Sequence, residues 1–135
     1  MKKKLNCILL VDDDPDDNFF NQIIINEMDI VDHIDTASNG LEALAYLKRE
    51  NQILPELIFL DINMPRMNGW EFLNEYKHLS PSQKAKVLIL ILSTTANPDD
   101  IKRAKEIKEV SGFASKPVSK EMLTEILQKH FQDYL

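Results

Sequence analysis

The sequence is poor in cysteine, in basic charge and in long hydrophobic runs. Cys7 is the single cysteine, which excludes an internal disulfide and a cysteine-based zinc site. The net charge of −6 offers no basic surface for nucleic acid. The longest aliphatic run, Val87 to Leu92, is far shorter than the roughly 20 residues of a membrane span, and the apolar stretch after the basic start is too short for a signal peptide. We therefore expect a cytoplasmic protein, without membrane insertion, that is a monomer or weak dimer.

What is present fits one compact domain. A chain of 135 residues has the usual length of a single domain, and its hydrophobic fraction of 44% is enough for one core. Neither a linker nor an internal repeat divides it. We expect residues 1–135 to form one domain, and we expect no attached output domain because the chain ends soon after the last predicted helix.

Short apolar runs alternate with segments of helical periodicity. The predicted strands are Leu5–Val11, Ile34–Ala37, Leu57–Leu60, Val87–Leu92 and Gly112–Ser115. The predicted helices are Pro15–Asp29, Gly40–Arg49, Trp70–Leu79, Pro98–Val110 and Lys120–Phe131. Strict alternation predicts a parallel sheet with right-handed crossovers. Two of the strands are apolar without alternation, which indicates helices on both faces of the sheet. The predicted fold class is α/β, with a five-stranded, doubly wound parallel sheet.

Several of the predicted helices begin at recognisable caps. Asp14 and Asn97 each precede a proline, and Ser119 precedes the last helix, so all three can accept hydrogen bonds from first-turn N–H groups. Asp16 and Asp17 follow in the first turn, where negative charge is favourable. We interpret Asp14, Asp16 and Asp17 as charge at the start of a helix.

Polar residues follow four of the five predicted strands. The first strand is followed by two acids, the third by one acid, the fourth by two hydroxyl residues and the fifth by a lysine: Asp12 and Asp13, Asp61, Ser93 and Thr94, and Lys116. Ligands of open α/β sheets bind at the carboxyl ends of the strands. We therefore expect these residues to form one site.

The three acids predict a metal site next to a nucleophile. Carboxylates held close together raise one another's pKa, so they need a cation. Oxygen ligands without a suitable histidine or cysteine favour a hard ion such as Mg²⁺. Asp61 stands alone at its strand end and is the candidate nucleophile towards a phosphoryl group, whereas Asp12 and Asp13 form a pair suited to the ion. The ion, the Lys116 ammonium and a hydroxyl would stabilise charge on the transferred group.

Three segments carry a resemblance to a known family. They are residues 8–15 (ILLVDDDP), residues 60–69 (LDINMPRMNG) and residues 116–117 (KP). Together they resemble the receiver family of two-component response regulators, in its single-domain, chemotaxis-type form. The similarity covers essentially the whole chain, in the right order and spacing. It implies the flavodoxin-like (βα)5 receiver fold and a phosphorylation-dependent switch that is fed by a histidine kinase or phosphotransfer protein. It also implies that the chain is not an enzyme beyond Mg²⁺-dependent self-phosphorylation and autodephosphorylation.

The resemblance gives each residue of the site a role. Asp61 matches the phosphorylated aspartate. Asp12 and Asp13 match the acidic pair that holds Mg²⁺ together with Asp61, and Asn63 matches the position whose backbone carbonyl binds the same ion. Lys116 matches the lysine that contacts the phosphoryl group.

Two further positions match the residues that switch on activation. The hydroxyl is Ser93 if it directly follows the predicted strand, or Thr94 if it is counted back from Lys116 by the usual interval of the family. We prefer Ser93, because a strand end fixes geometry. Phe113 matches the aromatic that changes rotamer. Phosphorylation would draw Ser93 inwards and let Phe113 repack, changing the affinity of the last two helices and last strand for an unknown target protein.

Two other functions would use similar residues. A phosphohydrolase of the haloacid-dehalogenase type shares the parallel sheet, the Mg²⁺ and the aspartyl phosphate, but it needs Asp-x-Asp-x-Thr/Val, whereas Asp12 and Asp14 are followed here by Asp16. A degenerate receiver would bind partners without phosphorylation. The complete set of acids and the lysine argues against this second alternative.

Overall fold

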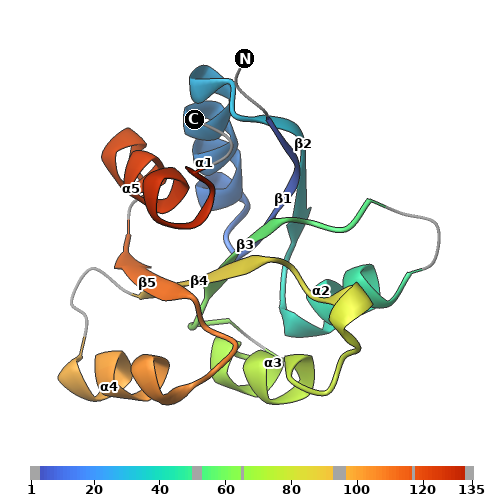
Figure 1. The fold of residues 1–135 in the computed structure, drawn as a ribbon. Coiled ribbons are helices and arrows are strands. Elements are labelled where there is room, and N and C mark those ends of the chain that lie inside the picture. The colour runs from blue at the N-terminus through green and yellow to red at the C-terminus, as the bar shows by residue number, and fades with distance from the viewer. Residues whose placement is uncertain (1–3, 50–52, 65, 93–96, 117, 133–135) are drawn as a thin grey trace.

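The computed structural model describes residues 4–49, 53–64, 66–92, 97–116 and 118–132, and within them strands and α-helices alternate, five of each (Figure 1). The strands are β1 (Leu5–Val11), β2 (Val31–Ala37), β3 (Leu57–Asp61), β4 (Val87–Leu92) and β5 (Gly112–Ser115). The helices are α1 (Pro15–Met28), α2 (Gly40–Lys48), α3 (Gly69–Tyr76), α4 (Pro98–Glu106) and α5 (Lys120–His130). A short 3₁₀ helix, Pro81–Gln83, lies between α3 and β4.

The strands form one parallel sheet in the order β2-β1-β3-β4-β5. This order confirms the predicted doubly wound α/β fold. The direction of winding reverses between β1 and β3, which creates a topological switch point at their carboxyl ends. Val11 pairs with Leu60 across these two strands, so the residues that follow them, Asp12 and Asp61, are brought to the same place.

Helices cover both faces of the sheet, with α1 and α5 on one side and α2, α3 and α4 on the other (Figure 1). Each face has its own hydrophobic cluster, built from alternate residues of the same strands. The α1 and α5 side buries Ile25, Leu123, Ile126 and Leu127 against Ile8, Leu10 and Ile89. The opposite side buries Leu47, Phe72, Leu73 and Tyr76 against Leu9, Leu60 and Leu90. Both faces of the central strands are therefore apolar, which is why their sequences show no alternation.

Strand β2 begins three positions before the predicted start, at Val31 rather than Ile34. It lies at the edge of the sheet, and His33, which pairs with Cys7 of β1, is exposed. An edge strand needs few apolar side chains. The first residues of β2 therefore carry no hydrophobic pattern from which the start of the strand could have been predicted.

Helices α3 and α4 end earlier than predicted, at Tyr76 and Glu106 rather than Leu79 and Val110. After α4 the chain turns back towards the sheet, where the backbone N–H of Ser111 donates to the Leu88 carbonyl of β4 at 2.8 Å. Within the part of the chain that the structure describes, none of the helices combines the length and the apolar character needed to cross a membrane.

Candidate functional site

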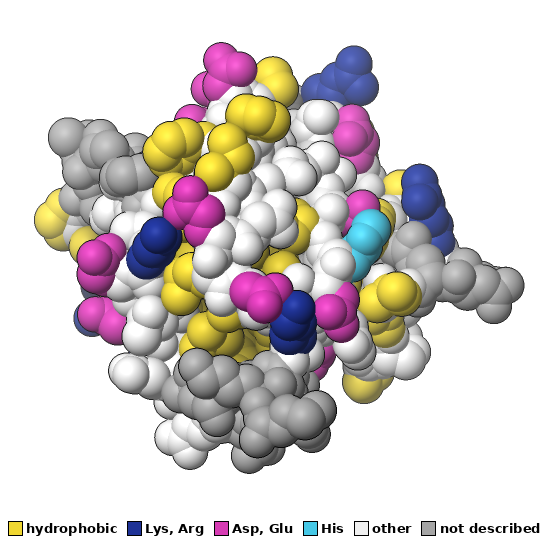
Figure 2. All heavy atoms as spheres, turned by 90° about the horizontal axis from the view of Figure 1, so that it is seen from above, with side chains coloured by type: hydrophobic (Ala, Val, Ile, Leu, Met, Phe, Trp, Pro, Cys, Tyr) yellow, Lys and Arg dark blue, Asp and Glu magenta, His cyan; other side chains and the backbone are white. Residues whose placement is uncertain are grey.

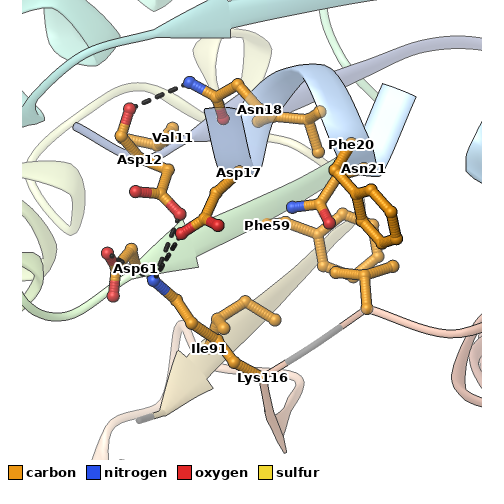
Figure 3. Close-up of a pocket in the computed structure, with 12 residues that line it drawn as sticks. Val11, Asp12, Asp17, Asn18, Phe20, Asn21, Phe59, Asp61, Ile91 and Lys116 are labelled. Atoms are coloured by element: carbon orange, nitrogen blue, oxygen red, sulfur yellow. Dashed lines mark hydrogen bonds and ion pairs between the residues drawn. The ribbon is translucent and has the colours of Figure 1, made fainter. Parts of the chain in front are cut away.

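A lysine and two buried acids meet at the carboxyl ends of β1, β3 and β5 (Figure 3). Asp12 follows β1 and is 6% exposed, and Asp61 ends β3 and is 3% exposed. Lys116 follows β5, and its Nζ lies 3.3 Å from Asp12 Oδ2 and 3.2 Å from Asp61 Oδ2. The structure thus brings together residues that are far apart in the sequence.

Backbone N–H groups fix the two buried carboxylates in place. Asp12 Oδ1 accepts a hydrogen bond from the Asp14 N–H at 3.0 Å, and Asp61 Oδ1 accepts one from the Asn63 N–H at 3.2 Å. The Oδ2 atom of each carboxylate is the one that faces Lys116. Each buried acid therefore has one oxygen held by the backbone and one paired with a charge, as a buried anion requires.

Asp13 completes a cluster whose chemistry suits a divalent ion. Asp12, Asp13 and Asp61 each offer one carboxylate oxygen, and these oxygens all lie within 4.8 Å of one another. Asp13 is exposed, so the cluster faces solvent on one side. Three oxygen ligands with an open side fit Mg²⁺, which usually keeps several waters in proteins. Asn63 lies two residues after Asp61 of this cluster, and the binding of its carbonyl to the ion stays a prediction.

Burial and neighbouring charges shift the pKa values of Asp12 and Lys116. Burial raises the pKa of Asp12 to about 6, and the charge of Asp61 adds to this, against the opposing effects of the Asp14 N–H and Lys116. For Lys116, burial lowers the pKa, but the charges of Asp61 and Asp12 outweigh it and raise the pKa above its ordinary value. Lys116 is therefore a permanent cation at neutral pH.

The raised pKa of Asp12 predicts that stability increases on mild acidification. Because this pKa is about 6 in the folded protein and 3.8 for the ordinary group, the folded chain binds a proton in a range where the unfolded chain does not. Lowering the pH from about 7 to about 5 should then stabilise the fold by about 1 kcal/mol through this residue. Urea unfolding with EDTA, at both pH values, measures the gain. Asp12→Asn should lack this contribution, and an equal gain in wild type and variant would contradict the assignment.

Two residues of α1 also belong to this site, although the sequence analysis did not place them there. Asp17 Oδ2 lies 3.3 Å from Lys116 Nζ, so the interpretation of Asp17 as helix charge alone was incomplete. Asn18 is buried, and its Nδ2 donates to the Asp12 carbonyl at 2.9 Å. Side chains in the first turn of a helix tilt towards its N-terminus. This tilt could have indicated that Asp17 and Asn18 point towards the site.

A cavity of about 70 Å³ opens beside Lys116, between α1 and the sheet (Figure 3). It is lined by polar groups of Asp17 and Asn18 and by apolar side chains that include Phe20 and Phe59. Among the described residues, Asn18 Oδ1 is the one buried side-chain polar atom without a hydrogen-bond partner. Buried polar atoms normally have a partner, and the cavity is large enough for water, so we expect an ordered water at this atom.

The predicted switch residues are only partly described. Phe113 lies on β5 and is 37% exposed, with Lys105 Nζ 5.9 Å from the centre of its ring. Ser93 and Thr94 lie outside the described residues. The roles of all three stay predictions.

Comparison with known proteins gives the family. A family model described as "Response regulator receiver domain" matches residues 8–128. The chain belongs to this family. Receiver domains are phosphorylation-dependent signalling switches of two-component systems; they bind Mg²⁺ in general and interact with a histidine kinase or phosphotransfer partner.

Individual relatives agree with this assignment. A crystal structure of a two-component response regulator from Cytophaga hutchinsonii is 31% identical, with a TM-score of 0.85 over 96% of this chain and 99% of that one. Response regulator Rcp1 of Synechocystis is 35% identical over 70% of this chain and 65% of its own length. Sporulation initiation phosphotransferase F of Bacillus subtilis is 28% identical over 85% of this chain and 88% of its own. Several other curated relatives are longer proteins, of which the match spans 15% to 55%.

Proposed function

We propose that this receiver accepts a phosphoryl group on the Asp61 carboxylate from a phosphohistidine of a sensor kinase or phosphotransfer protein. The observation that carries the proposal is the arrangement of Asp61, buried between a cationic lysine and two further acids of a potential ion cluster. We also propose that residues 1–135 act as one receiver domain. Its two hydrophobic clusters share a single sheet, which supports this organisation.

The residues of the site suit phosphoryl transfer. A carboxylate oxygen of Asp61 forms a bond to phosphorus while the bond between phosphorus and the donor's imidazole nitrogen breaks, and the leaving imidazole takes up a proton. Lys116 Nζ, 3.2 Å from Asp61 Oδ2, is placed to neutralise charge on the phosphoryl oxygens. Asp12, Asp13, Asp61 and the Asn63 carbonyl would hold Mg²⁺, which supplies further neutralising charge when bound. Ser93, or Thr94 in its place, would donate a hydroxyl hydrogen bond.

The outer surface of α1 supports a protein as the donor. Figure 2 shows the side of the molecule that α1 and α5 cover, where hydrophobic side chains lie exposed among charged ones. Phe19, Phe20 and Ile23 of α1 are 67%, 55% and 42% exposed. Phe20 also lines the cavity beside Lys116, so this apolar surface adjoins the site. A helical surface of a phosphodonor protein could bury these side chains next to Asp61.

The signal would leave through protein contacts. Phosphorylation of Asp61 would draw in Ser93 or Thr94 and let Phe113 of β5 repack, altering the surface formed by α4, β5 and α5. We propose that this surface binds a target protein. With a phosphodonor of the two-component type, phosphoryl transfer and target binding would both take place in the cytoplasm.

Labelling with a small acyl phosphate tests the proposal directly. We expect acetyl phosphate to transfer its phosphoryl group to the wild-type protein with Mg²⁺ present, and EDTA to reduce the rate at least about tenfold, because the ion neutralises charge on the transferred group. Trypsin then separates Asp61, in the peptide of residues 50–66, from Asp12, in the peptide of residues 5–48. Label on the first peptide supports the receiver, and label on the second supports the phosphohydrolase. A folded protein that takes up no label would be a degenerate receiver.

A further inference from the structure

Lys116 has three carboxylate partners, and one of them lies outside the acidic cluster. Its Nζ is 3.2 Å from Asp61, 3.3 Å from Asp12 and 3.3 Å from Asp17. The ammonium donates hydrogen bonds to Asp61 Oδ2 and Asp17 Oδ2, and its contact with Asp12 Oδ2 is an ion pair. A phosphoryl group on Asp61 must therefore share the Lys116 ammonium with the carboxylates of Asp12 and Asp17.

Asp17 differs from the other two partners in position and exposure. It lies on α1, whereas Asp12 and Asp61 end strands, and it is not part of the carboxylate cluster that could hold an ion. Its side chain is 45% exposed, against 8% for Asp12 and 4% for Asp61. Asp17 therefore adds a negative charge beside Lys116 that remains there when the acidic cluster binds an ion and when Asp61 is phosphorylated.

We propose that Asp17 slows the phosphorylation of Asp61 by competing with the phosphoryl oxygens for the Lys116 ammonium and by repelling the anionic phosphoryl group. Asp17 is thus a positioning residue that acts through Lys116. The inference rests on the proposed phosphorylation of Asp61. Because the Asp17 side chain is half-exposed and its ion pair is screened by water, its removal should change the rate between about twofold and tenfold.

The test compares Asp17→Asn with Asp16→Asn. Asp16 is the neighbouring residue on α1, is exposed, and makes no ion pair among the residues that the structure describes, so the matched variant removes the same charge without touching Lys116. The initial rate of labelling by acetyl phosphate is measured with saturating Mg²⁺, at low and high salt. In this reaction the phosphorus–oxygen bond of acetyl phosphate breaks, a bond from phosphorus to an Asp61 oxygen forms, and acetate leaves.

We expect Asp17→Asn to be labelled between about twofold and tenfold faster than Asp16→Asn at low salt, and the difference to shrink at high salt because the competing charge is screened. A purely structural role of Asp17 would lower the rate or leave it unchanged, and either result overturns the inference. A wild-type protein that takes up no label on the peptide of residues 50–66 would instead overturn the proposed function. Urea unfolding of both variants checks that they fold equally well.

Discussion

Asp61→Asn is expected to reduce labelling by acetyl phosphate to background, a fall of at least about 100-fold, because an amide cannot attack phosphorus as a carboxylate does. The change is nearly isosteric. The new side-chain carbonyl can still accept from the Asn63 N–H, which donates to Asp61 Oδ1 at 3.2 Å in the wild type. Loss of label therefore reports loss of the nucleophile rather than loss of the site.

Controls distinguish loss of the nucleophile from a change in the rest of the protein. Asp16→Asn should be labelled at a rate close to wild type, since the Asp16 side chain is exposed and has no contact with Lys116 in the described structure. Intact mass measurement gives the phosphoryl content of each protein, and thermal unfolding shows that each is folded. Label that persists in the folded Asp61→Asn protein, on the peptide of residues 5–48, would move the chemistry to Asp12 or a neighbouring acid and contradict the proposal.

Gly69→Ala is expected to destabilise the protein by about 2 kcal/mol, because the added methyl group would overpack the backbone next to Asp61. Gly69 begins α3, and its N–H donates to the Ile62 carbonyl at 3.0 Å. A Cβ atom on Gly69 would lie 2.7 Å from Ile62 Cα and 2.8 Å from the Asp61 carbonyl oxygen. Both are backbone atoms that cannot move without shifting the end of β3. Alanine favours helices over glycine by up to about 1 kcal/mol, so a net loss reports this clash.

Gly112→Ala is the matched control for this substitution. Among the described residues, a Cβ on Gly112 would meet only Ile89 Cδ1, at 3.4 Å, and the end of a side chain can move aside. We expect Gly112→Ala to change the unfolding free energy by less than about 1 kcal/mol. Urea unfolding followed by circular dichroism measures both variants. If Gly69→Ala is as stable as Gly112→Ala, α3 can move away from β3, and the close packing behind Asp61 is not required.

Local signals in the sequence predicted most of the elements. The caps were correct: the Asp14 side chain accepts from the Asp16 N–H, Asn97 from the Asp99 N–H and Ser119 from the Met122 N–H. A cap and a proline act within a few residues, so both can be recognised in the sequence without tertiary structure. The start of β2 and the end of α4 were misplaced because both depend on pairing with distant strands.

The sequence by itself determined the order of strands and helices and the identity of the acids and lysine at the strand ends. Hydrophobic periodicity and strand-end chemistry are properties of short segments, and Asp12, Asp61 and Lys116 stand out on that scale. Only the tertiary structure decided that Asp17 shares the same lysine, 99 residues away in the sequence. That contact depends on how α1 packs over the sheet. This packing is set by the buried residues of α1 and α5, two helices that are far apart in the sequence.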